Sequence, residues 1–260
     1  MHLESLFDKR HEGVAERRVA LADAAARLSP SVLEAHTPMP GDPVAAAYTV
    51  PVPEALGALL PSGLRRGAVT GLDDDGYLAA ALVGGAVAAG GSAALIGVGD
   101  LGVEAVLAAG ADPERLIVVD APAQAWVDAA EVLIGALDVV LLRPPGAVPD
   151  AVVRRITARL RRGQARTALL AAGGSWPAPV RLRVAGPQWI GLADGHGQLA
   201  ARRAAVIAEG RGTYGRPRTA RVWLPTFDGS IRELTDTRAL PEGPRPRLEL
   251  VPGLGPPAAA

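Results

Sequence analysis

The middle of the chain alternates short, wholly apolar runs with longer alanine-rich or amphipathic stretches, a pattern typical of strands and helices in turn. The apolar runs predict strands at residues 68–71, 92–97, 116–119, 139–142 and 167–171. The longer stretches predict helices at residues 75–89, 101–109, 123–137 and 149–162. Because the strands are apolar on both faces, we expect a parallel sheet lying between two layers of helices.

After residue 171 the pattern changes. Strand-like runs follow one another at residues 180–184, 189–192, 204–208 and 219–224, separated by glycine-rich turns and without helices between them. Strands joined by short turns pair antiparallel. The sequence therefore predicts an α/β fold with a mostly parallel sheet between helices and an antiparallel extension on its C-terminal side.

Both ends of the chain differ from this core. Residues 3–28 have apolar side chains near heptad spacing and predict an amphipathic N-terminal helix, whereas repeated prolines interrupt regular structure over residues 29–53. We therefore divide the chain into an N-terminal helix and linker (1–49), a core domain (50–225) and a proline-rich tail (226–260). We expect much of the tail from Arg238 onward to be flexible.

Composition sets the protein class. The chain of 260 residues is 49% hydrophobic and 21% charged, which suits one good-sized core. It has no cysteine, no unbroken apolar run long enough to span a membrane, and no basic-then-apolar leader. We therefore expect a cytoplasmic protein with no membrane partner.

Charge is distributed unevenly although the formal net charge is zero. Residues 1–150 carry a net charge of −11 and residues 151–221 a net charge of +12. The most concentrated basic face is on the helix predicted at 149–162 and comprises Arg154, Arg155, Arg159, Arg161 and Arg162, of which the spacing puts Arg155, Arg159 and Arg162 near one side. We expect this face to contact either DNA, without sequence specificity, or an acidic protein surface. The alternative is that the two halves face each other and partly neutralise within the fold.

The turn after the first predicted strand has the glycine spacing of a phosphate-binding loop without its chemistry. Residues 71–78 read G-L-D-D-D-G-Y-L, so Gly71 and Gly76 hold the two glycine positions. A working loop continues with lysine and then serine or threonine, which contact phosphate and Mg²⁺; Tyr77 and Leu78 stand there instead. The variable positions include Asp73, Asp74 and Asp75, whose charges would repel a polyanion. We expect no ordinary nucleotide binding, and Asp74 or Asp75 can instead cap the helix that follows.

The order of elements from about residue 50 to 224 resembles the ATPase core of the RecA recombinase superfamily. The segment L-L-P-S-G-L-R-R-G-A-V-T-G at 59–71 resembles that family's entry into the phosphate-loop strand. Two further segments, A-A-L-I-G-V-G (93–99) and D-V-V-L-L-R (138–143), correspond to family strands that end in catalytic and metal-binding acidic residues. By this resemblance Gly99 replaces the glutamate that activates water, and Arg143 replaces the aspartate of the Mg²⁺ shell. With Tyr77 and Leu78, four ATPase positions are changed, and the resemblance implies a pseudo-ATPase without cofactor.

Within the superfamily, the chain is similar to the ImuA-type proteins of actinobacterial mutasomes. The segments G-H-G-Q-L-A-A-R-R (195–203) and Y-G-R-P-R-T-A-R-V-W-L-P (214–225) carry this likeness. The resemblance implies an accessory factor for translesion synthesis in the SOS response. Its partners would be an inactive Y-family-polymerase-like subunit of the ImuB type, an error-prone replicative-type polymerase, RecA and DNA. The alternative is a RecA-like regulatory protein, recombination mediator or cell-division inhibitor that still binds nucleotide in an atypical way.

Other candidate residues add little chemistry. The spans that correspond to the DNA-binding loops of recombinases, 144–147 and 173–180, are short, which argues against filament-style DNA binding. The four histidines are scattered, with no partner at ligand spacing, so we expect no metal site. Candidate anchors for a protein interface are Phe7, Trp126 and Trp223, because large aromatic side chains dominate such interfaces.

Overall fold

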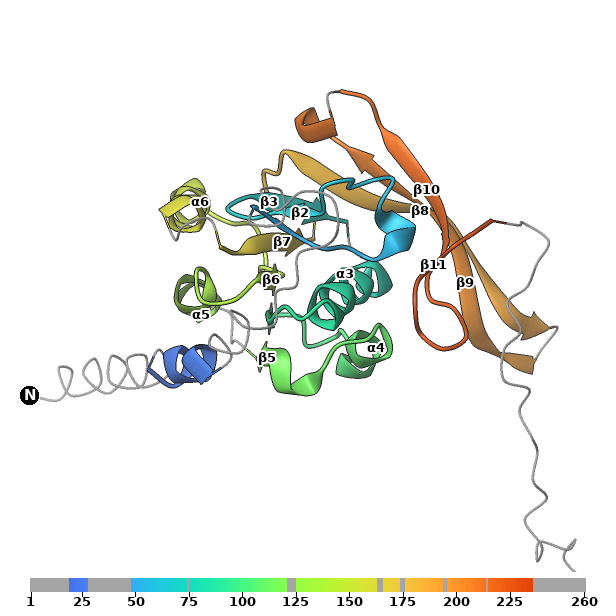
Figure 1. Cartoon of the computed structure of the whole chain (residues 1–260), viewed down its shortest axis with the longest axis horizontal. Helices are drawn as coiled ribbons and strands as arrows, with labels where there is room; N and C mark the ends of the chain where they lie inside the picture. Colours follow the sequence, from blue (N-terminus) through green and yellow to red (C-terminus); the bar gives the residue numbers. More distant parts are fainter. Residues whose placement is uncertain are drawn as a thin grey trace, which may run out of the picture.

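The computed structural model describes residues 19–27, 48–73, 75–120, 125–162, 166–173, 176–193, 196–213 and 215–235. Within them lie a two-stranded sheet and a nine-stranded sheet with helices on both sides (Figure 1). The predicted N-terminal segment therefore appears only as helical residues 19–27, and most of the predicted tail lies outside the described residues.

The large sheet has the order β11-β10-β9-β8-β3-β7-β6-β4-β5. Its parallel part consists of β3 (Val69–Leu72), β4 (Ala93–Ile96), β5 (Leu116–Val119), β6 (Val139–Leu142) and β7 (Ala168–Ala172). Every residue of β3, β4, β6 and β7 is buried, as expected for strands covered on both faces. Because crossovers place β3 in the middle of the sheet, the carboxyl ends of β3, β4, β6 and β7 meet at one edge.

The antiparallel part begins beside β3. Its first strand, β8 (Val180–Ala193), pairs parallel with β3, and the chain then continues through β9 (His196–Glu209), β10 (Arg218–Trp223) and β11 (Arg232–Glu233), each antiparallel to its predecessor. The predicted α/β class, with antiparallel strands on the C-terminal side, is confirmed. The strand β11 extends the sheet past residue 225, the predicted end of the core.

Helices cover the two faces of the parallel part separately. The helices α3 (Gly76–Ala88) and α4 (Val103–Ala108) lie on one face, and α5 (Trp126–Leu133) and α6 (Asp150–Arg162) on the other (Figure 1). Each pair encloses its own cluster of buried side chains. The helical residues 19–27 join the second cluster through the fully buried Ala25.

Two predicted elements differ from the structure for local reasons. The helix expected over 123–137 ends at Leu133, because Gly135 adopts a φ of 95° that a helix cannot contain. The strands expected at 180–184 and 189–192 are one strand, β8, whose register against β9 shifts between Ala185 and Gln188. Such a bulge accommodates the extra residues and bends the strand.

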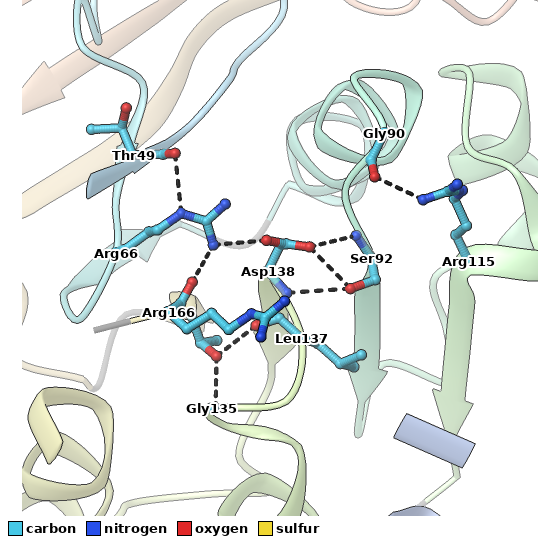
Figure 2. A network of polar contacts seen from close by, with 10 residues as sticks. Thr49, Arg66, Gly90, Ser92, Arg115, Gly135, Leu137, Asp138 and Arg166 are labelled. Carbon is cyan, nitrogen blue, oxygen red and sulfur yellow. Dashed lines mark hydrogen bonds and ion pairs between the residues drawn. The ribbon is translucent and has the colours of Figure 1, made fainter. Parts of the chain in front are cut away.

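At the amino edge of the parallel strands, a buried ion pair holds the sheet together (Figure 2). The Asp138 carboxylate lies 2.7 Å from Nη1 of Arg66 and accepts hydrogen bonds from the amide and hydroxyl of Ser92 at 3.0 and 3.1 Å. Arg66 also donates to the carbonyl oxygens of Thr49 and Arg166. The network therefore ties the β1–β2 hairpin (Thr49–Val50 and Leu64–Arg65) to the starts of β4, β6 and β7.

The helices that the structure describes include none that combines the length and apolar character needed to cross a bilayer.

Candidate functional site

The turn between β3 and α3 occupies the carboxyl edge of the sheet, where parallel α/β folds commonly bind ligands. Gly71 lies inside β3 with neighbours on both sides, and Gly76 is the first residue of α3. The intervening turn is residues 73–75, of which Asp74 lies outside the described residues. Asp75 is the N-cap, and its Oδ1 accepts a hydrogen bond from the Leu78 amide at 2.9 Å. A side-chain carboxylate therefore takes the position at the helix N-terminus where a phosphate would be bound.

The charge of Asp75 is neutralised by an arginine from the distant strand β9. Arg202 donates to both carboxylate oxygens, from Nη1 at 2.8 Å and from Nη2 at 2.9 Å. Its Nε donates to the Leu224 carbonyl oxygen at 2.6 Å. Only 8% of the Arg202 side chain and 15% of the Asp75 side chain are exposed. This bidentate pair is largely shielded from water and therefore stronger than a surface ion pair.

Two aromatic rings fix the position of the Arg202 guanidinium. Its Cζ lies 5.2 Å from the ring centre of Tyr77 and 5.5 Å from that of Trp189. The two rings meet edge to face, with centres 5.6 Å apart. Tyr77, which stands where a phosphate loop has lysine, thus contacts the chain's own cation. Asp75, Tyr77, Trp189 and Arg202 form a closed unit, which we call the Asp75–Arg202 cluster.

A second arginine lies over Gly71. Arg181 of β8 is within 3.6 Å of the Asp73 carboxylate, measured from Nη1 to Oδ1, and donates from Nη2 to the Trp176 carbonyl oxygen at 2.8 Å. A Cβ atom at Gly71 would lie 3.0 Å from Cζ of Arg181 and 3.2 Å from the side chain of Ala178. The glycine at position 71 thus leaves room for the Arg181 guanidinium beside β3.

Gly99 and Arg143, which stand where the RecA-like family has acidic residues, follow the neighbouring strands β4 and β6. Arg143, directly after β6, forms an ion pair with Asp100, which follows β4. The hydrogen bonds from Arg143 hold the pKa of Asp100 below its ordinary value. A Cβ atom at Gly99 would contact no atom within 4 Å, so this position carries no constraint from packing. The structure therefore brings Arg143 and residues 99–100 together at the ends of β6 and β4.

Taken together, the carboxyl edge contains three internal arginine–aspartate pairs: Asp75–Arg202, Asp73–Arg181 and Asp100–Arg143. Sequence reasoning identified Asp73, Asp75 and Arg143 but missed Arg181, Arg202, Trp189 and Asp100. No signal at short range could have found Arg202, because it lies 127 residues from Asp75. Among the described residues no group of three or more histidine or acidic side chains could hold a metal ion.

The predicted arginine face on α6 is divided by a contact with α5. All five arginines are exposed. However, Arg155 forms an ion pair with Glu131 of α5, with Nε 2.5 Å from Oε1, and Arg159 donates to the Glu131 carbonyl oxygen at 3.2 Å. These two side chains hold α6 against α5. Arg154 and Arg161, seven residues apart and on one stripe of the helix, form no side-chain hydrogen bond or ion pair with any residue that the structure describes.

The tryptophans proposed as interface anchors lie inside the fold. Trp126 packs edge to face against Trp176, with ring centres 6.4 Å apart, and both Trp126 and Trp223 are 6% exposed. In this structure neither ring is presented to a partner. Phe7, Asp74 and the histidines at positions 2, 11 and 36 lie outside the described residues, and His196 begins β9.

Comparison with known proteins finds a family model that matches part of the chain and a similar mycobacterial protein. Residues 58–178 match a family model described as the MT3502 N-terminal domain. This match begins before β2 and ends two residues before β8, so it covers the strands β3 to β7 but not Arg181 or Arg202.

The chain is also 38% identical over 128 residues to Rv3395c, an uncharacterized protein of Mycobacterium tuberculosis. The aligned part makes up 48% of this chain and 62% of that protein, so the chain matches less than two thirds of the relative's length.

Proposed function

We propose that this protein is a non-catalytic, RecA-like accessory protein of an SOS-induced translesion-synthesis mutasome. Its role is that of a scaffold that binds an inactive Y-family-polymerase-like subunit, with an error-prone replicative-type polymerase, RecA and DNA as further partners. It would associate with the nucleoid when engaged. The sheet order and the antiparallel C-terminal strands support the resemblance to a RecA-like core, and the similar mycobacterial chain is compatible with an actinobacterial mutasome group.

The observation that carries the proposal is the Asp75–Arg202 cluster. In a phosphate loop, the helix N-terminus and a lysine together bind the phosphates of the nucleotide. Here Asp75 accepts the helix N–H group and Arg202 supplies the positive charge, so the anion and its counterion both belong to the chain. A nucleotide would have to displace a shielded, bidentate ion pair and would meet the Asp73 carboxylate beside it. The fold is retained while the chemistry of phosphoryl transfer, which needs positioned cations and a metal, is lost.

Equilibrium binding of a fluorescent ATP analogue, with and without Mg²⁺, tests the non-catalytic part of the proposal. We expect no saturable binding, with an active RecA-type ATPase as the positive control. The variant Tyr77→Lys restores the missing lysine at a partly exposed position; we expect no gain of binding, because the Asp75–Arg202 ion pair still occupies the helix N-terminus. Saturable micromolar binding by the wild-type protein would overturn this part and favour a nucleotide-binding regulatory protein.

Co-purification tests the scaffold part. The full-length protein and the polymerase-like subunit from the same genome are co-expressed, with a tag on only one of them. We expect a complex that survives size-exclusion chromatography. Deletion of either coding sequence should lower damage-induced mutation frequency to a similar extent, and deletion of both should lower it no further. Failure to form the complex at micromolar concentrations of both proteins would refute the scaffold role.

The exposed stripe of Arg154 and Arg161 makes DNA the second partner of interest. Both guanidinium groups are available on the surface of α6, whereas Arg155 and Arg159 are engaged by Glu131. Arginines that contact only phosphates bind without sequence preference, which is the behaviour expected of a scaffold near damaged DNA.

A further inference from the structure

In the part of the chain that the structure describes, no helix lies over the outer face of the antiparallel strands (Figure 1). Along β9, the side chains of Val206 and Ala208 are buried against the core, so alternation turns those of Arg203, Ala205 and Ile207 to the other side. Ala205 is paired with Ala185 of β8 and with Arg221 of β10. On this face the described residues provide a sheet surface without a covering layer, whereas the parallel strands are enclosed on both sides.

A groove of about 460 Å³ crosses this face where β8 bends. It lies at the bulge between Ala185 and Gln188, where Gly186 has a φ of 57°. We call it the β8–β10 groove; it is lined by Ala185, Gly186, Gln188, Arg203, Ala204, Ala205, Arg221 and Leu234. Alanine and glycine line much of it, so its depth comes from small side chains on adjacent strands. This volume lies in the range of about 300–1,000 Å³ typical of ligand pockets.

The lining of the groove is positively charged. It contains two arginines and no acidic residue. The Gln188 side chain accepts a hydrogen bond from Nε of Arg203 at 2.8 Å, which orients that guanidinium. Arg221 is exposed, and its guanidinium forms no hydrogen bond or ion pair within the part of the chain that the structure describes. An occupant that complements this groove has carboxylates for the arginines and a small apolar side chain for the alanine floor and Leu234.

The groove suits a protein segment better than a nucleic acid strand. Single-stranded nucleic acids bind grooves in which aromatic side chains stack on the bases. No aromatic residue lines this groove, and the nearby Trp189 faces Arg202 on the opposite side of the hairpin.

We infer that the β8–β10 groove is the docking site for an acidic segment of a protein partner. The inference rests on the function proposed above, under which that partner is the polymerase-like subunit. The region that matches the family model ends at residue 178, so this surface belongs to the part of the chain that the family match does not cover.

The test measures the affinity of the purified full-length protein for the purified polymerase-like subunit by biolayer interferometry. The variants are Arg221→Glu, which reverses one charge in the groove, and Ala205→Trp, which fills it without a change of charge. We expect each to weaken binding about tenfold or more, and the wild-type affinity to fall as salt is raised. The matched control is Arg211→Glu, an exposed arginine in the turn after β9 that does not line the groove; it should bind as the wild type does. Thermal melts of all variants must match the wild type.

A photo-crosslinking amino acid at position 205 then identifies the occupant in the same complex. Crosslinks to an acidic peptide of the polymerase-like subunit support the inference. Crosslinks to residues 236–260 of this chain or to a second copy would overturn it, as would groove variants that weaken DNA binding and leave partner binding intact. If both groove variants bind the partner normally, the groove is not the docking site, although the proposed scaffold function still stands. If the wild type does not bind the subunit at all, the proposed function falls, and the inference with it.

Discussion

Replacement of Arg202 by methionine would remove the cation of the Asp75–Arg202 cluster while keeping much of the side-chain volume. The Asp75 carboxylate, 15% exposed, would then lose its only ion-pair partner among the described residues, and the Leu224 carbonyl oxygen would lose its donor from Nε. Breaking a buried ion pair from one side costs about 3–5 kcal/mol, because the remaining charge stays in a poorly solvated place. For a domain of this size each kcal/mol lowers the melting temperature by about 2–4 °C, so we expect a decrease of about 6–20 °C.

A double-mutant cycle isolates the ion pair from the helix cap. Asparagine is as good an N-cap as aspartate, so Asp75→Asn removes the charge but can keep the hydrogen bond to the Leu78 amide. We therefore expect Arg202→Met to cost clearly less free energy of unfolding in the Asp75→Asn background than in the wild type. Arg202→Lys should not restore stability, because lysine can make neither the bidentate contact nor the bond to Leu224.

Urea unfolding followed by circular dichroism measures all four corners of the cycle. Two results would refute the reasoning. If Arg202→Met lost less than about 1 kcal/mol, the pair would be no stronger than an exposed one. If the two single losses simply added in the double variant, the side chains would not be coupled and the cluster would not be a closed unit.

Three further predictions concern other parts of the chain. Asp138→Ala leaves the 6% exposed Arg66 without its carboxylate and should lower the free energy of unfolding by about 3–5 kcal/mol in urea titrations; a loss as small as that of Asp112→Ala, at a longer and more exposed pair with Arg115, would contradict the role given to the amino-edge network. Hydrogen bonds from Ser230 and Thr226 hold the pKa of Asp228 below its ordinary value, so its stabilising contribution is present above the unfolded-state pKa and is lost as the pH falls through the folded-state pKa. Wild type and Asp228→Asn should therefore differ most in melting temperature near pH 7 and converge in strong acid, and a difference that grows as the pH falls would reverse the assigned sign. Finally, Arg154→Ala with Arg161→Ala should reduce the slope of log affinity for DNA against log salt by about two, whereas Arg155→Ala with Arg159→Ala should change it less; equal changes would show that the contact with Glu131 does not divide the helix face.

The sequence alone determined the layer architecture of this protein. Strands such as Val139–Leu142 are apolar on both faces, and only a sheet covered by helices can bury them. The lack of helical stretches between the strand-like runs after residue 171 indicated the antiparallel extension, which the structure contains. Local sequence also predicted that Asp74 or Asp75 would cap the helix after β3, and Asp75 does so. These features depend on contacts within a few residues or on the period of a single element.

Only the tertiary structure decided how the changed phosphate loop is filled. The sequence indicated that Tyr77 and Leu78 cannot bind phosphate, but not that Arg202 supplies the missing charge from a strand 127 residues away. The partner of an arginine depends on which strand ends the topology brings together, and this chain has an arginine or lysine at 27 positions from which to choose. For the same reason the sequence placed Arg155, Arg159 and Arg162 near one side of α6 but did not show that Glu131 of α5 binds the first two. The hydrophobic pattern sets which faces are buried, and the fold then decides which charges meet.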